Sequence, residues 1–154
     1  MKYCFSKRPI PDRDSLNHES PQAEAHPVIV YDGHCVLCSA NARFVLKHDR
    51  RGYFRLAAMQ GPAGAALMSL AGVDPDDPDS LIVVDGTRVL RDSDAVLAIW
   101  AGLGWPWRAL TVFRLIPRVM RDFVYRLVAR NRYRLFGRRE QCFVPDARWK
   151  DHIL

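Results

Sequence analysis

The sequence predicts an α/β fold in which a four-stranded mixed sheet is covered by helices on both faces. Two observations lead to this prediction. Between residues 27 and 104, strand-like and helix-like segments follow one another in the order βαβ, α, ββ, α. In addition, the dipeptide Asp85-Gly86 separates two short apolar segments, which is typical of a tight β-hairpin. A βαβ unit combined with a hairpin gives a mixed sheet.

The βαβ unit begins with residues 28–31, VIVY, which are apolar at every position, as expected for a strand buried on both faces. Asp32-Gly33 ends this strand. Apolar residues then recur at helical spacing over residues 36–48, and residues 53–58 alternate as a second strand. The two strands and the helix between them complete the unit.

The second half of this region supplies the remaining elements. Residues 61–70 are rich in Ala, Leu and Met and predict a short helix, and the acidic segment 74–79 predicts a loop. Residues 81–84 and 87–90 form the two strands of the hairpin, and residues 95–101 form the last helix of the sheet region. We therefore expect residues 27–104 to form the core of the protein.

Residues 1–26 are polar, contain three prolines and show no apolar period, so we expect a flexible N-terminal tail. The tail has no apolar stretch typical of a secretory signal, which favours a cytoplasmic protein. Apolar runs elsewhere are too short and too often interrupted by arginine for a transmembrane segment. In a reducing cytoplasm, a CxxC pair is more often catalytic or metal-binding than a structural disulfide.

Residues 105–154 form a basic C-terminal extension. Its first part, 105–139, holds ten arginines against a single acidic residue, Asp122, a net charge of +9 in a chain whose total is +6. Apolar residues recur there every three or four positions, and Pro117 suits the first turn of a second helix. We therefore expect amphipathic helices that pack on the core.

The arginine-rich helices allow several roles. Arginines interleaved with Tyr133 and Phe136 are able to bind nucleic acid or an anionic membrane surface. A solvated helix face whose arginines pair with the acidic loop at 74–79 is the simpler alternative. We favour a structural role in which this segment helps to frame the site around the cysteine pair.

The cysteine pair is the main candidate for chemistry. Cys35 lies where a strand turns into a helix, and Cys38 lies one turn inside that helix. Free backbone N–H groups and the helix dipole favour the thiolate of the first cysteine. The spacing brings Cys38 close enough to resolve a mixed disulfide formed at Cys35. This pattern predicts thiol-disulfide exchange, which requires no organic cofactor.

A structural metal site is an alternative from a different class of protein. A zinc ion needs four ligands, and CxxC supplies two of them. Cys142, together with His34 or Cys4, would complete a zinc-binding or interaction module. Without such a role, Cys142 is either a third thiol near the pair or a small buried apolar residue.

Two neighbours of the pair have more than one interpretation. Asp32 lies three residues before Cys35, so it would either accept a proton during exchange or cap the helix through its carboxylate. His34 is adjacent to Cys35 and either stabilises the thiolate or points to water.

The segment Asp32-x-x-Cys35-x-x-Cys38, preceded by an apolar strand, resembles the signature of the DCC family of thiol-disulfide oxidoreductases. Ser93-Asp-Ala-Val96 resembles the middle section of that family, and the segment from Tyr133 to Cys142 resembles its C-terminal block. The resemblance covers about residues 27–145. It implies a thioredoxin-like fold and disulfide reductase or oxidase chemistry, with Cys35 and Cys38 as the redox pair.

Together these observations predict a thiol-disulfide oxidoreductase of the protein-disulfide reductase type. Its catalytic residues would be Cys35, Cys38 and Asp32. Its partners would be a disulfide-containing protein or a small thiol substrate, and an external thiol that reduces the pair after each turnover.

Overall fold

The computed structural model describes residues 26–73, 81–143 and 145–154. The predicted N-terminal tail (apart from His26), the acidic loop 74–79 and Cys4 therefore lie outside the described residues.

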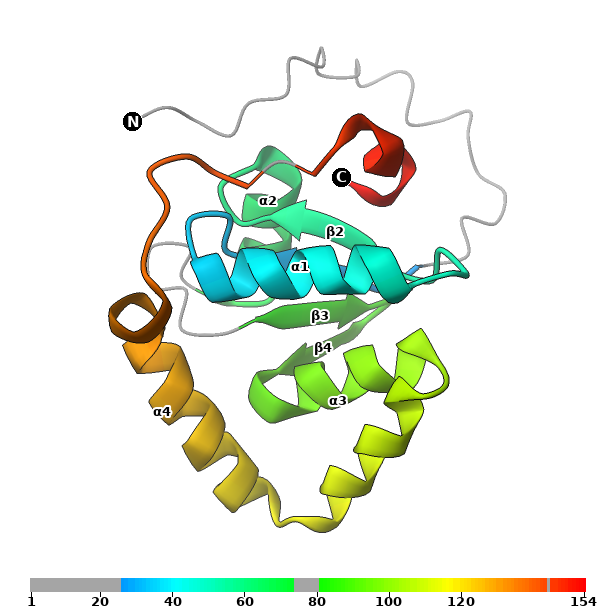
Figure 1. Ribbon diagram of the computed structural model, residues 1–154, viewed down its shortest axis with the longest axis vertical. Helices are drawn as coiled ribbons and strands as arrows, with labels where there is room; N and C mark the ends of the chain where they lie inside the picture. Colours follow the sequence, from blue (N-terminus) through cyan, green and yellow to red (C-terminus); the bar gives the residue numbers. More distant parts are fainter. Residues whose placement is uncertain (1–25, 74–80, 144) are drawn as a thin grey trace.

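The predicted fold class is confirmed: four strands form one mixed, open sheet with helices on both faces, consistent with a thioredoxin-like fold (Figure 1). The strand order is β2-β1-β3-β4, in which β1 is parallel to β2 and antiparallel to β3, and β3 is antiparallel to β4. The strands are β1 (Val28–Tyr31), β2 (Arg55–Ala58), β3 (Ile82–Asp85) and β4 (Arg88–Arg91).

Three helices cover the sheet, and the alternation of β1 side chains explains their placement. Ile29 and Tyr31 point into one apolar cluster, which contains residues of α1 (Val36–His48) and α3 (Asp92–Leu103). Val30 points to the other face of the sheet, where it packs with Met68 of α2 (Pro62–Leu70). Because β1 is covered on both faces, it has to be apolar at every position.

The C-terminal extension consists of η2 (Trp107–Leu115), α4 (Arg118–Phe136) and η3 (Ala147–His152). The first of these segments is a 3-10 helix rather than a regular α-helix. Its C-cap, Ile116, is extended (φ −73°, ψ 132°), as expected of a residue that precedes a proline. After α4 the chain returns across the molecule, and its end lies beside β2, where the Leu154 N–H donates to the Leu56 carbonyl at 2.9 Å.

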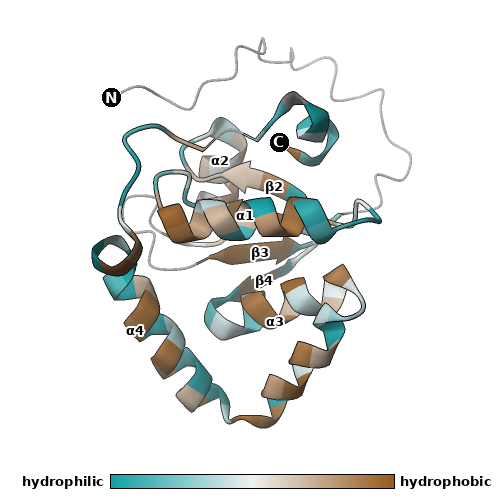
Figure 2. Cartoon of the chain, viewed as in Figure 1, coloured by the Kyte–Doolittle hydropathy of each residue, from teal (hydrophilic) through white to brown (hydrophobic). Residues whose placement is uncertain are grey.

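Several polar groups of α4 contact the rest of the protein. Arg121 pairs with Asp94 of α3 at 3.2 Å, and the hydroxyl of Tyr125 accepts the N–H of Leu81 at 3.0 Å. Hydrophobic residues recur along this helix, as the colouring of the cartoon in Figure 2 shows, yet Val119 and Phe123 are 81% and 69% exposed. Within the described residues, no helix is long and apolar enough to cross a membrane.

Candidate functional site

The end of β1 and the start of α1 position the cysteine pair. Cys35 is the N-cap of α1, with extended backbone angles (φ −81°, ψ 126°), and Cys38 lies in the first turn. The Cys35 sulfur accepts the backbone N–H of Cys38 at 3.3 Å, so a sulfur atom takes the place of the usual capping oxygen. Both cysteines are free thiols. The structure therefore places the pair where the sequence predicted it.

The surroundings of the pair make the two thiols unequal. The hydrogen bond from the Cys38 thiol is the main reason that the pKa of Cys35 falls to about 6. The Cys38 backbone N–H and the positive charge of Arg132 lower this pKa further, and they act against burial and the Asp32 carboxylate, which raise it. The same hydrogen bond and burial raise the pKa of Cys38 above its ordinary range. Cys35 is thus the thiolate of the pair near neutral pH.

Asp32 is buried and lies at the centre of a hydrogen-bond network. Its Oδ1 accepts the backbone N–H of His34 at 2.9 Å and the side-chain amide of Gln60 at 2.8 Å. Its Oδ2 accepts the hydroxyl of Tyr133 and pairs with the Arg132 guanidinium at 3.4 Å. Burial raises the pKa of Asp32, but these donors outweigh it and hold the pKa below its ordinary value.

This network excludes one of the two interpretations of Asp32, that of a helix cap. Asp32 does not cap α1, because its carboxylate binds the N–H of His34, which precedes the helix, and Cys35 itself is the N-cap. The hydrogen bonds of His34 in the described structure run through its backbone, whose carbonyl also accepts the Arg139 N–H at 2.8 Å. His34 therefore helps to hold the loop between β1 and α1.

Two members of the network were not identified from the sequence. Gln60 comes shortly after the end of β2, just as Gly33 comes shortly after the end of β1. The side-chain oxygen of Gln60 accepts the Gly33 N–H at 3.1 Å. The signal for it was available, because the carboxyl ends of parallel neighbouring strands meet at one edge of the sheet. Arg132, buried on α4, is one hundred positions away from Asp32 in the chain. No local pattern indicates that pairing.

The segment after α4 covers the cysteine loop. Arg138 forms an isolated antiparallel bridge with Cys35, and the Phe143 N–H donates to the Gly33 carbonyl at 3.0 Å. Cys35 is fully buried, whereas Cys38 is partly exposed. Cys142 lies against Gly33 so closely that a Cβ atom at residue 33 would come within 2.2 Å of its sulfur. A glycine at this position therefore lets the two segments pack together.

The described residues also bear on the zinc alternative. Within residues 26–73, 81–143 and 145–154, no group of three His, Cys, Asp or Glu side chains is arranged to hold a metal ion. Cys35, Cys38 and Cys142 do not form such a group. Cys4, the other cysteine considered for such a site, lies outside the described residues.

The comparisons with known proteins agree with this geometry. A model of the DCC1-like thiol-disulfide oxidoreductase family matches residues 29–138. The chain belongs to this family. The resemblance noted in the sequence is thereby confirmed, and thiol-disulfide redox chemistry is the activity that the family description supports.

Two relatives are similar over most of their length. The uncharacterized protein YuxK of Bacillus subtilis (strain 168) is 32% identical over 127 residues, which cover 82% of this chain and 93% of the relative. The chloroplastic DCC family protein At1g52590 of Arabidopsis thaliana is 38% identical over 122 residues, which cover 79% and 71% of the two chains. No solved structure matches this chain.

Proposed function

We propose that this protein is a dithiol oxidoreductase of the protein-disulfide reductase type, with Cys35 as the attacking thiol and Cys38 as the resolving thiol. The observation that carries this proposal is the sulfur of Cys35 at the N-terminus of α1, where it accepts the Cys38 N–H and has a lowered pKa. The membership in an oxidoreductase family supports it.

In the first step, the Cys35 thiolate attacks one sulfur of a substrate disulfide. A bond forms between Cys35 and that sulfur, and the other substrate sulfur leaves as a thiolate, which takes up a proton. In the second step, Cys38 loses its proton and attacks the Cys35 sulfur, which releases the second substrate sulfur. The substrate gains two electrons, and the Cys35–Cys38 pair is oxidised. An external thiol then reduces the pair, which suits a reducing compartment such as the cytoplasm.

The unequal pKa values of the two thiols fit this order of events. A thiol with a lowered pKa is ionised before the substrate arrives and is also a good leaving group when Cys38 attacks. A thiol with a raised pKa stays protonated and does not compete for the substrate. In the mixed disulfide the hydrogen bond to the Cys35 thiolate is lost, and with it the main cause of the raised pKa of Cys38.

For Asp32, we propose a positioning role rather than proton transfer. Both of its oxygens already accept hydrogen bonds, and its lowered pKa makes it a weak base at neutral pH. Its carboxylate instead fixes the loop before Cys35 to β2 through Gln60 and to α4 through Arg132.

Substrate access is the second requirement. Because Cys35 is fully buried beneath the segment 138–143, a substrate disulfide reaches its sulfur only when this segment moves away. We propose that opening of this segment precedes the first step.

A disulfide reductase assay on the full chain, with insulin as the substrate and dithiothreitol as the reductant, tests the proposal. We expect Cys35→Ser to reduce the rate to the uncatalysed level, because no other described thiol occupies the N-cap of α1. We expect Cys38→Ser to accumulate a mixed disulfide with the substrate, visible as a mass increase that dithiothreitol removes. Equal rates for wild type and Cys35→Ser would rule out the dithiol mechanism.

A further inference from the structure

The C-terminal extension carries a series of exposed apolar side chains along η2 and α4, here called the apolar stripe. Their exposed fractions run from 39% to 84%, far above those of the core. The apolar stripe consists of Val112, Leu115, Ile116, Val119, Met120, Phe123, Val124 and Leu127. Exposed apolar residues are ordinary when they are scattered, but a contiguous set of this length marks a binding surface.

The helix α4 cannot bury the apolar stripe by rotating about its own axis, because its opposite face already contacts the rest of the protein. Arg121 binds Asp94, the Tyr125 hydroxyl accepts the Leu81 N–H, and Arg132 pairs with Asp32. These three contacts are spread over most of the helix and fix its rotation about its own axis. The apolar stripe is therefore held outward.

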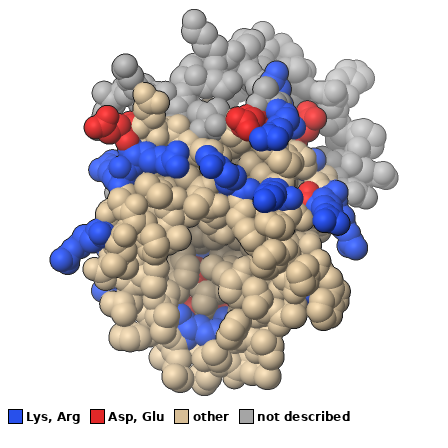
Figure 3. Space-filling view, viewed as in Figure 1, with Lys and Arg blue, Asp and Glu red and all other residues tan. Residues whose placement is uncertain are grey.

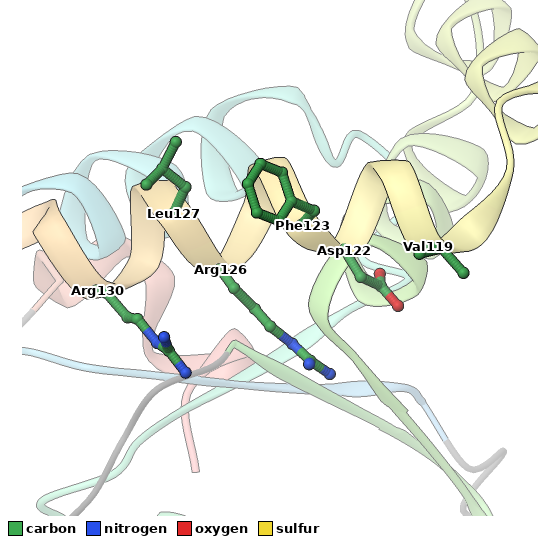
Figure 4. Close-up of a pocket in the computed structure, with 6 residues that line it drawn as sticks. All are labelled: Val119, Asp122, Phe123, Arg126, Leu127 and Arg130. Carbon is green, nitrogen blue, oxygen red and sulfur yellow. The ribbon is translucent and has the colours of Figure 1, made fainter.

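Cationic side chains lie beside the apolar stripe. An open groove of about 470 Å³ runs along α4, lined by Val119, Phe123 and Leu127 together with Asp122, Arg126 and Arg130. Figure 4 shows Arg126 and Arg130 extending side by side from one side of the helix, with Phe123 and Leu127 on the other. Figure 3 shows one face of the whole molecule, with a hollow in its lower half and charged side chains inside that hollow.

Several of these arginines are available to a partner. Arg114, Arg130 and Arg134 are exposed, and within the described residues no ion pair holds any of them. Over residues 105–139, Asp122 is the single acidic residue against ten arginines. The partner must therefore be apolar and negatively charged at the same time.

The charge disfavours a second copy of this chain as the occupant. Two copies joined through the apolar stripe would bring two segments of net charge +9 together, which is unfavourable. The surface of a bilayer with anionic lipids fits instead, because its headgroups attract arginines and its acyl region accepts apolar side chains to a shallow depth. We propose that the apolar stripe and its flanking arginines bind an anionic membrane surface, with η2 and α4 lying in the interface.

Co-sedimentation of the full chain with lipid vesicles tests this proposal. We expect binding to vesicles of phosphatidylcholine mixed with phosphatidylglycerol, little binding to phosphatidylcholine alone, and a loss of binding as salt increases. The combined change Arg114→Gln, Arg130→Gln and Arg134→Gln should weaken binding about a hundredfold. The combined change Val119→Ser, Phe123→Ser and Leu127→Ser should weaken it at least about tenfold.

Matched controls come from other exposed positions. Leu70→Ser on α2 removes a side chain that is 84% exposed, and Arg50→Gln with Arg51→Gln removes two exposed charges at the end of α1. Neither change should affect vesicle binding. Cys35→Ser should also bind vesicles like wild type, so a failure of the dithiol mechanism is distinguishable from a failure of this proposal.

Three outcomes would overturn the proposal. One is the absence of binding to the anionic vesicles. Another is unchanged binding by the serine variant while its unfolding midpoint matches that of wild type. The last is a dimer in sedimentation experiments without lipid that the serine variant abolishes, because a second copy would then cover the apolar stripe.

Discussion

The helices α1 and α4 are both amphipathic, but they attach to the protein by opposite faces. In α1, the apolar residues Ala42, Val45 and Leu46 are buried against the sheet. In α4, the residue that is fully buried is Arg132, and most of the apolar residues are exposed, with only Val128 and Ala129 partly buried. The hydrophobic effect therefore holds α1 in place, whereas hydrogen bonds and ion pairs contribute much more to the attachment of α4 than to that of α1.

This difference teaches that apolar residues at helical spacing reveal an apolar face on a helix, but they do not reveal which surface that face contacts. For α1, the partner is the sheet. For α4, the inward-facing side carries Arg121, Tyr125 and Arg132, each of which finds a specific acceptor or donor in the core. Contacts of this kind are directional, so they also set where the end of α4 meets Asp32.

The largest expected effect tests this difference directly with two phenylalanines. Phe54 is 1% exposed in the core, and Phe123 is 69% exposed on α4. Phe54→Ala should lower the free energy of unfolding by about 4 kcal/mol, because it leaves a cavity. Phe123→Ala should change it by less than about 0.5 kcal/mol. Urea unfolding measures both, and a cost at Phe123 as large as that at Phe54 would mean that the apolar face of α4 is packed inward.

A second prediction concerns the buried ion pair between α4 and the site. Arg132→Met keeps most of the side-chain volume but leaves the buried Asp32 carboxylate without its guanidinium partner. Removing one partner of a buried pair costs about 3 kcal/mol, so a loss of this size in the free energy of unfolding is expected. The control is Arg118→Met, whose side chain is 65% exposed in its ion pairs, and it should cost less than about 1 kcal/mol. Similar costs for the two variants would contradict a special role for Arg132.

Local sequence signals were sufficient for the sheet and for the cysteine pair. The apolar run of β1 and the helical period of α1 each act over a few residues, and the structure has both elements as predicted. The hairpin also forms, but one residue later than predicted: Asp85 is the last residue of β3 and pairs with Arg88, so the turn is Gly86-Thr87. The position of Cys35 at the N-cap could be predicted from these signals, because Cys35 lies at the junction of β1 and α1.

The parts that the sequence did not predict depend on contacts between distant segments. The pairing of Arg132 with Asp32, the burial of Cys35 beneath residues 138–143 and the outward apolar face of α4 are examples. Each depends on how the extension docks, which no short pattern specifies. The division of the chain into a core of residues 27–104 and an extension of residues 105–154 that packs on it stays a prediction.

A third prediction separates the influence of α1 on the Cys35 thiol from that of α4. The Cys38 thiol is the largest cause that lowers the pKa of Cys35 to about 6, and the charge of Arg132 is a smaller one. Cys38→Ala should therefore raise this pKa toward the ordinary value of about 8.5, and Arg132→Met should raise it less. The pH dependence of the ultraviolet absorbance of the thiolate measures both shifts. A larger shift in Arg132→Met would make α4 the main influence.

The same pKa predicts a pH dependence of stability. Because the folded pKa of Cys35 lies below the unfolded value, the thiolate stabilises the reduced protein fully above about pH 8.5. That contribution is lost as the pH falls through about 6. As the pH falls over this range, the free energy of unfolding of the reduced wild type should thus decrease relative to that of Cys35→Ser. If the two free energies of unfolding change in parallel with pH, this would contradict the lowered pKa.

The smallest expected effect concerns the segment that covers Cys35. Arg139→Pro removes the N–H that donates to the His34 carbonyl, one of the backbone contacts between this segment and the cysteine loop. The loss of one such hydrogen bond, about 1 kcal/mol, should favour the open segment and speed alkylation of Cys35 about fivefold. Mass spectrometry of the peptide that carries Cys35 measures the rate.

The control for this prediction is Arg139→Gln, which removes the same exposed charge but keeps the backbone N–H, so its alkylation rate should equal that of wild type. If the proline and glutamine variants react at the same rate, the backbone contact does not limit access to Cys35. If the glutamine variant alone reacts more slowly, the charge of Arg139 attracts the reagent. A faster reaction confined to the proline variant means that the C-terminal extension controls when the thiolate meets its substrate, whereas Cys38 of α1 has the largest influence on how reactive that thiolate is.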